Sequence, residues 1–190
     1  MKRASSLLPT KYGHFRIYVY QDQNKKEHLA IVKGDINHQE NVPVRLHSEC
    51  LTGDVFGSLR CDCGEQLEKT FVLLGKEKKG LVLYLRQEGR GIGLLNKIKA
   101  YDLQEHGLDT VEANHHLGFK SDEREYHQAA HILNDLGVRS VSLITNNPSK
   151  IIGLEKHGVI INKRISLVTT PHQHNQGYLL AKKSKLGHEL

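Results

Sequence analysis

The three cysteines of this 190-residue sequence, Cys50, Cys61 and Cys63, all lie in one short stretch. An odd number of thiols does not pair completely into disulfides. Cys61 and Cys63 point the same way if their segment is extended, so Cys50 need only fold back to complete three corners of a tetrahedron. Thiolate ligands favour zinc. Three protein ligands leave a position for water, as at a catalytic site, whereas His47 as a fourth ligand would make the site structural. The alternative is three small buried side chains in a reduced compartment, because this spacing is not a common zinc-finger spacing.

A glycine-rich segment, Arg86-Gln-Glu-Gly-Arg-Gly-Ile-Gly93, is a second candidate for chemistry. It lies between a predicted strand and a predicted helix, where glycines let the backbone approach a ligand and helix N–H groups face an anion. It matches neither the Walker A pattern nor Gly-x-Gly-x-x-Gly, so phosphate binding and a simple tight turn are both compatible with it. Nearby arginines favour phosphate, which guanidinium groups suit better than lysines do: Arg45, Arg60, Arg86 and Arg90.

The segment Ser121-Asp-Glu-Arg124 predicts the start of a helix. Ser121 or Asp122 would accept hydrogen bonds from the exposed N–H groups, and the acidic residues match the positive end of the helix dipole. Asp122 and Arg124 are two residues apart, so inside a helix they would not face one direction. Joint action of the two therefore requires one of them at or before the first turn.

Composition sets the class of protein. Hydrophobic residues make up 38% and charged residues 25% of the chain, close to the averages of soluble proteins. No stretch approaches the roughly 20 apolar residues of a membrane span, and the apolar part of the N-terminus is too short for a secretory signal, so a cytoplasmic location is expected. The formal net charge of +6 implies attraction to anions, with nucleic acid and a phosphorylated metabolite equally compatible.

The hydrophobic pattern predicts an α/β fold, in which a mixed sheet with an N-terminal antiparallel hairpin is flanked by helices. Strands are expected at about residues 15–20, 29–32, 42–48, 81–85, 138–145 and 159–167. Helices are expected from Gly64 to Gly80, from the glycine-rich segment to Gly107, from Ser121 to Gly137 and from Pro148 to Gly158. The second of these helices carries Leu94, Leu95, Ile98 and Tyr101 toward one side, and the tail from Ala181 is either a helix or a mobile end.

These residues resemble GTP cyclohydrolase II, the enzyme that opens riboflavin biosynthesis, over nearly the whole chain. The matching motifs are Glu49-Cys-Leu-Thr-Gly-Asp54, Ser58-Leu-Arg-Cys-Asp-Cys-Gly64, the glycine-rich segment extended to Lys97, Asp109-Thr-Val-Glu-Ala-Asn114, Leu117-Gly-Phe119, Asp122-Glu-Arg124, Leu143-Ile-Thr-Asn-Asn-Pro148 and a terminal Lys-x-x-Lys-Leu-Gly-His. The resemblance implies one GTP cyclohydrolase II-like domain over residues 1–190, with about 1–10 and 170–190 as candidates for mobile ends. With that domain over residues 1–190, we expect no room for the dihydroxybutanone-phosphate synthase that is fused to some relatives.

The resemblance also implies a site. Cys50, Cys61 and Cys63 match the ligands of one Zn²⁺ per subunit, Asp122 the proton acceptor, Arg124 the nucleophile, and Tyr101 a tyrosine needed for the complete reaction with release of formate. The implied GTP contacts are Arg45, Leu46, His47, Ser48, Glu49, Gln66, Glu88, Gly89, Arg90, Thr110, Thr145 and Lys150. For Arg124 a charge-stabilising role is physically simpler, because its guanidinium stays protonated and has no free lone pair.

The implied reaction converts GTP and water to formate, pyrophosphate and 2,5-diamino-6-(5-phosphoribosylamino)pyrimidin-4-one. It uses zinc, with Mg²⁺ on the triphosphate, in a homodimer that binds neither nucleic acid nor membrane.

Other classes compete with this interpretation. A basic zinc-containing nucleic-acid-binding protein would need a fourth ligand at short spacing, and only 6% of the residues are aromatic. A zinc deaminase would need a Pro-Cys-x-x-Cys element that is missing. The presence of every matched metal and catalytic position argues against a catalytically silent GTP-binding relative.

Overall fold

The computed structural model describes residues 2–187, which form two compact units. The sheet unit holds the described residues up to His47 together with Leu67–Arg86 and Glu125–Leu167. The cysteine unit holds Ser48–Gln66, Gln87–Arg124 and the described residues from Val168 onward. The single domain over residues 1–190 that the sequence predicts stays a prediction.

The sheet unit contains a seven-stranded mixed sheet, in the order β1-β2-β3-β5-β4-β6-β7. Its strands are β1 (Lys2–Thr10), β2 (Gly13–Gln21), β3 (Glu27–Lys33), β4 (Val42–Ser48), β5 (Gly80–Leu85), β6 (Val141–Ile144) and β7 (Ile161–Ile165). Strand β1 pairs antiparallel with β2, β2 with β3, and β3 with β5. Strand β6 pairs parallel with both β4 and β7. The predicted fold class and hairpin are thus confirmed, and β1 is a strand that the sequence pattern did not predict.

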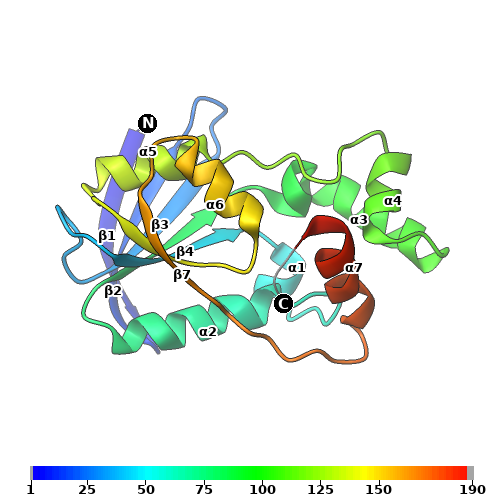
Figure 1. Ribbon diagram of the computed structural model, residues 1–190, viewed down its shortest axis with the longest axis horizontal. Helices are drawn as coiled ribbons and strands as arrows, with labels where there is room; N and C mark the ends of the chain where they lie inside the picture. Colours follow the sequence, from blue (N-terminus) through cyan, green and yellow to red (C-terminus); the bar gives the residue numbers. More distant parts are fainter. Residues whose placement is uncertain (1, 188–190) are drawn as a thin grey trace. The chain divides into compact units, whose positions relative to one another are not determined.

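Helices cover both faces of this sheet: α5 (His127–Asp135) and α6 (Pro148–Glu155) lie on one face and α2 (Cys63–Lys76) on the other (Figure 1). Side chains of β5 alternate between the faces because successive residues of a strand point in opposite directions. Leu81 and Leu83 belong to one apolar cluster with Ile132 of α5, and Val82 belongs to a second cluster with Leu74 of α2. The alternation therefore gives the sheet unit an apolar layer on each face.

The cysteine unit consists of short helices and long connections. Its elements are α1 (Leu51–Asp54), the 3-10 helix η1 (Glu88–Gly91), α3 (Gly93–Glu105), α4 (Thr110–His116) and α7 (Gln176–Leu186). Helix α3 packs on η1 and α4, and α4 packs on α7. Of the two alternatives for the tail, the structure has a helix, α7. No helix among the described residues is both long and apolar enough to cross a membrane.

One expectation about a helix needs correction. The helix predicted from Ser121 begins instead at His127, because the Asp122 carboxylate accepts hydrogen bonds from Arg124, and Glu123 from the Lys120 N–H, in an irregular segment. Helix α4 was not predicted.

The apolar side of α3 is not its buried side. Leu94, Leu95 and Ile98 are exposed, with Leu95 at 71%. Lys97 and Ala100 are buried in their place. The buried lysine has ionic partners, and a pattern of apolar residues does not predict the burial of such a charged side chain.

Candidate metal and substrate site

The three cysteines come together in the cysteine unit. Their sulfur atoms all lie within 4.8 Å of one another, and Cys50 Sγ is 3.6 Å from Cys61 Sγ. Tetrahedral zinc with Zn–S bonds of about 2.3 Å requires sulfur atoms about 3.8 Å apart. The cluster therefore has both the donor type and the spacing of a zinc site. None of the three cysteines forms a disulfide.

Gly53 lies directly beneath this cluster. A Cβ atom at Gly53 would lie 2.8 Å from Cys61 Sγ and 3.2 Å from Cys50 Sγ, closer than real side chains pack. A Cβ atom at Gly64 would collide with the carbonyl oxygen of Gly53. Gly53 therefore stands where the backbone approaches the sulfur atoms closely, and Gly64 stands where two backbone segments meet.

The charge of the cluster is unevenly distributed. Hydrogen bonds from the thiols of Cys61 and Cys63, and the nearby Lys97 ammonium, hold the pKa of Cys50 far below its ordinary value. The hydrogen bond with the Cys50 sulfur in turn raises the pKa of Cys61 and of Cys63. One thiolate repels the formation of the next, so three thiolates together require a cation.

Lys97 links the cysteines to the glycine-rich turn. Its Nζ lies 3.2 Å from Cys50 Sγ, 3.0 Å from Thr52 Oγ1 and 2.8 Å from Glu88 Oε1. Burial acts to lower the pKa of Lys97, but Glu88 and Cys50 outweigh it and raise that pKa, so the ammonium stays charged. The other carboxylate oxygen of Glu88 accepts a hydrogen bond from the Leu51 N–H at 2.7 Å. The Glu88 carboxylate is therefore engaged within the protein.

Tyr101 lies on the same side of α3 as Lys97. The Lys97 Nζ is 5.7 Å and the Arg60 guanidinium 4.9 Å from the centre of its ring. Arg60 itself pairs with Glu105. Burial raises the pKa of Tyr101, so its hydroxyl keeps its proton to a higher pH than that of an ordinary tyrosine.

The glycine-rich turn has the backbone conformation that its composition suggests. Gly89 and Arg90 are both left-handed, with φ of 62° and 60°, and the non-glycine Arg90 is held there at a cost of about 1–3 kcal/mol. A Cβ atom at Gly91 would lie 3.0 Å from the backbone of Glu123. The Arg90 carbonyl also accepts from the Glu123 N–H at 3.0 Å. The turn therefore packs closely on the segment that carries Asp122 and Arg124.

Asp122 and Arg124 form a bidentate ion pair ahead of α5. Arg124 Nε donates to Asp122 Oδ1 at 2.8 Å, and Nη2 donates to Oδ2 at 2.6 Å. Burial acts to raise the pKa of Asp122, but its hydrogen bonds with Arg124 outweigh burial and hold that pKa below its ordinary value. Both residues lie before the first turn of the helix, as joint action requires. Arg90 faces the same segment, with Nη1 3.5 Å from the Ser121 carbonyl oxygen.

Three further predicted contacts in the cysteine unit have different surroundings. The Ser48 hydroxyl is buried and has no hydrogen-bond partner within residues 2–187. The Gln66 amide donates to Asp62 Oδ2 at 2.6 Å. Thr110 begins α4, where the Asp109 side chain caps the helix. These positions stay predictions as substrate contacts, as does Glu49.

Five predicted contacts lie in the sheet unit, near the ends of β4 and β6: Arg45, Leu46, His47, Thr145 and Lys150. The two strands are parallel neighbours, so their carboxyl ends meet at one edge, where open α/β sheets bind ligands. Lys150 Nζ donates to the Leu46 carbonyl oxygen at 2.6 Å, and Arg45 Nη1 donates to the Ile144 carbonyl oxygen at 3.1 Å. His47 stacks on Tyr84, with ring centres 5.4 Å apart. The fold therefore gathers these residues at one edge of the sheet.

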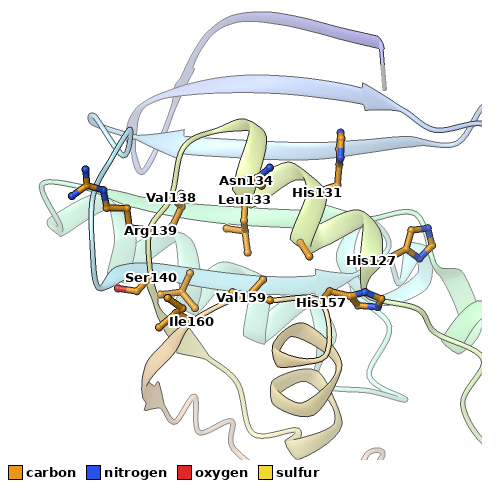
Figure 2. Close-up of a pocket in the computed structure, with 13 residues that line it drawn as sticks. His127, His131, Leu133, Asn134, Val138, Arg139, Ser140, His157, Val159 and Ile160 are labelled. Carbon is orange, nitrogen blue, oxygen red and sulfur yellow. The ribbon is translucent and has the colours of Figure 1, made fainter.

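A separate hollow lies in the sheet unit between α5 and the segments around residues 138–141 and 157–160 (Figure 2). Its volume is about 310 Å³, and His127 and His157 lie together at one end of it. None of the predicted site residues lines it.

The sheet with its parallel β4-β6 edge, and the three-thiol cluster beside a glycine-rich turn, define an α/β protein with a candidate site for a metal ion. The sequence matches the GTP cyclohydrolase II family over residues 2–166. The chain belongs to the GTP cyclohydrolase II family, which confirms the resemblance seen in its motifs.

Two kinds of relative match the chain. GTP cyclohydrolase-2 of Picrophilus torridus is 50% identical over 181 residues, which are 95% of this chain and 94% of that protein. Riboflavin biosynthesis protein RibBA of Bacillus subtilis (strain 168) is 56% identical over 185 residues, 96% of this chain and 46% of RibBA. RibBA of Phocaeicola vulgatus is 54% identical over 184 residues, with the same coverage. The chain thus spans about half the length of its RibBA relatives.

A solved structure shares the fold. It is the crystal structure of RibBX, a two-domain 3,4-dihydroxy-2-butanone 4-phosphate synthase from A. baumannii, with a TM-score of 0.50 and 20% identity. The likeness covers 86% of this chain and 40% of that one.

The motifs missed several residues that shape the site. Lys97 closes the glycine-rich motif, yet nothing in the sequence distinguished it from a solvated helix lysine. Gly53 lies inside the cysteine motif, but a glycine in such a place is equally typical of an ordinary turn. Asp62 stands between two cysteines, which was a signal that it shares their surroundings.

Proposed function

We propose that the protein catalyses the GTP cyclohydrolase II reaction of riboflavin biosynthesis. GTP and water give formate, pyrophosphate and 2,5-diamino-6-(5-phosphoribosylamino)pyrimidin-4-one. Water adds at C8 of guanine, at the formamide that ring opening leaves, and at the α-phosphorus. The observation that carries the proposal is the three-cysteine cluster, hydrogen-bonded through Lys97 to the glycine-rich turn, in a chain of the GTP cyclohydrolase II family.

Cys50, Cys61 and Cys63 are the residues that would hold a zinc ion, one per subunit. The fit rests on three thiol donors within 4.8 Å of one another and on Gly53, which leaves room beside them. When bound, zinc lowers the pKa of water enough to make hydroxide available near neutral pH. Lys97 offsets the negative charge of the Cys50 thiolate, and its contact with Glu88 holds the glycine-rich turn beside the cysteines.

Tyr101 is the proposed proton donor for ring opening and release of formate. Its hydroxyl carries a proton at neutral pH, as that of an ordinary tyrosine does, and burial raises its pKa further. Lys97 and Arg60 near its ring place positive charge where a developing phenolate would be stabilised.

Asp122 and Arg124 are proposed to act on the phosphate chain as an ion pair. Arg124 donates from Nε and Nη2 to Asp122, so these nitrogen atoms carry protons and are not nucleophiles. Asp122, whose pKa is held low, is a weak base and a good anchor for the guanidinium. We therefore assign Arg124 to charge stabilisation of the leaving pyrophosphate, together with Arg90 and with Mg²⁺ on the triphosphate.

The remaining GTP contacts are proposed from their places in the two units. The sheet unit supplies Arg45, Leu46, His47, Thr145 and Lys150, and the cysteine unit supplies Ser48, Glu49, Gln66, Glu88, Gly89, Arg90 and Thr110. Glu88 is proposed to act through the placement of its backbone, because its carboxylate is already bonded to Lys97 and to the Leu51 N–H.

The protein is further proposed to be a cytoplasmic homodimer. Three free thiols suit a reducing compartment. An exposed apolar side of α3, formed by Leu94, Leu95 and Ile98, is the kind of surface that a second copy covers. Analytical ultracentrifugation tests the dimer, which we expect Leu95→Glu to convert to a monomer.

The function is tested with zinc-quantified protein, GTP and Mg²⁺, with formate and pyrophosphate assayed together. Release of both products, and loss of formate in a Cys61→Ser variant, is the expected result. Ammonia release would identify a deaminase instead. Zinc-loaded protein that releases neither product, yet binds random oligonucleotides in a salt-sensitive way, would overturn the proposal.

A further inference from the structure

Asp62 is a buried carboxylate between two of the clustered cysteines. Its side chain is fully buried, and its residue is 1% exposed. Lys182 Nζ donates to Oδ1 at 2.6 Å, while Gln66 Nε2 and Thr169 Oγ1 donate to Oδ2 at 2.6 and 3.1 Å. Both carboxylate oxygens are therefore satisfied, and two of the three donors come from the C-terminal segment.

The segment from Thr169 to α7 makes further contacts with the site. The Thr170 N–H donates to Glu65 Oε1 at 3.2 Å. One turn before Lys182 on α7, the Tyr178 ring has the Lys182 Nζ 4.4 Å from its centre and the Arg90 guanidinium 6.0 Å from it. The segment thus contacts both the cysteine loop and the glycine-rich turn, although the family match ends at residue 166.

The burial of both charges indicates what the Asp62–Lys182 pair does. A carboxylate with no exposure to water cannot stay charged without a partner, and removal of one member of a buried pair is strongly destabilising. Lys182 is itself 6% exposed, so neither group has solvent as an alternative partner. The loop can hold Asp62 in this place only while α7 supplies the ammonium.

We propose that Lys182 is a positioning residue for the cysteine loop. By fixing the Asp62 carboxylate it fixes the backbone on either side, and so places the thiols of Cys61 and Cys63 for a common metal ion. The inference rests on the proposed zinc site, and it assigns a role to the first lysine of the terminal Lys-x-x-Lys-Leu-Gly-His motif.

The test compares Lys182→Met with Lys183→Met, which removes the neighbouring exposed lysine of the same helix. Zinc affinity is measured without GTP by competition with a chromogenic chelator, and the thiolate-to-metal absorption is recorded with Co²⁺ in place of zinc. Loss of a contact that orients metal ligands typically costs 10- to 100-fold in affinity. We expect that loss, with an altered Co²⁺ spectrum, for Lys182→Met, and wild-type values for Lys183→Met.

Two further variants keep the test decisive if Lys182→Met does not fold. Lys182→Arg keeps the charge and should bind zinc within about tenfold of wild type. The charge-neutral double variant Asp62→Asn/Lys182→Met should bind zinc more tightly than Lys182→Met, or fold where that variant does not.

A wild-type affinity and Co²⁺ spectrum for Lys182→Met would overturn the inference. A double variant no better than the single one would show that Lys182 does not act through Asp62, and would overturn it as well. Because the readout is metal binding, wild-type protein that binds zinc but does not turn over GTP would count against the proposed function and leave this inference standing.

Discussion

The sheet unit buries two apolar clusters, whereas the cysteine unit buries lysine–carboxylate ion pairs. Both apolar clusters of the described residues lie in the sheet unit, on opposite faces of the same strands. The cysteine unit instead encloses the ion pairs Lys97–Glu88 and Lys182–Asp62 beside the three thiols. Hydrophobic burial is additive and tolerant of small changes, but a buried charge depends on one particular partner. The order of the cysteine unit should therefore depend on single groups, and that of the sheet unit on many.

Removal of the metal should have the largest effect, and it should affect the cysteine unit but not the sheet unit. Chelation removes the cation that three thiolates require and returns protons to Cys61 and Cys63, so we expect activity to fall by more than about a hundredfold. Hydrogen exchange, followed by mass spectrometry, should become more than about tenfold faster around Cys50–Cys63 and η1 and stay unchanged in β3 and β5. Equal loss of protection in both units would break the comparison.

The next effect is the loss of the cation that faces Cys50. Lys97→Met leaves the Glu88 carboxylate buried without its ammonium partner, which should lower the free energy of unfolding by about 3–5 kcal/mol. Denaturant titration of the zinc-loaded protein measures this, with Lys99→Met, an exposed lysine of the same helix, as the control.

The double variant Glu88→Gln/Lys97→Met distinguishes charge from packing. It removes both charges and should recover most of the lost stability. No recovery would mean that Lys97 stabilises α3 by the packing of its side chain rather than by its charge.

A core substitution in the sheet unit should lower the free energy of unfolding by less. Its effect should be the same with and without bound metal. Leu83 of β5 is fully buried in the apolar cluster with α5 and α6, so Leu83→Ala should lower the free energy of unfolding by about 2–5 kcal/mol. The exposed Leu7 of β1 provides a control, since Leu7→Ala should change the free energy of unfolding by no more than about 0.5 kcal/mol. A cost for Leu83→Ala that disappears on zinc removal would contradict the separation of the two units.

The same contrast explains what the sequence could predict. Strands such as β5 and the β2-β3 hairpin follow from apolar patterns that are local, and the cysteines and the Asp122–Arg124 pair follow from residue type and spacing. Lys97 and Lys182 could not be predicted as buried, because a lysine in a polar helix is most often solvated. The partner of Lys182 lies 120 residues away, so no local pattern relates the two. The start of the helix after Arg124 was misplaced for a similar reason. A sequence does not distinguish an aspartate that caps a helix from one that forms an ion pair.

The smallest expected effect concerns a buried histidine of the sheet unit whose pKa is lowered. His28 is 2% exposed, its Nε2 lies 3.4 Å from Asp22 Oδ2, and its Nδ1 accepts from the Arg86 N–H at 3.2 Å. Burial lowers the pKa of His28 below its ordinary value of 6.5, although Asp22 opposes this. The unfolded chain therefore binds this proton at a higher pH than the folded protein does. Stability from neutral His28 should be complete above about pH 6.5 and decline below it, by no more than about 1.4 kcal/mol per pH unit.

The measurement is the free energy of unfolding from pH 7.5 to 5 for wild type and His28→Gln, because the difference between the two cancels the other histidines. The wild-type protein should lose stability faster than the variant as the pH falls. Parallel curves would mean that the folded protein binds the His28 proton as readily as the unfolded chain does. The sheet unit would then hold His28 and Asp22 as a buried ion pair, and the contrast between a unit that buries apolar clusters and one that buries ion pairs would be weaker.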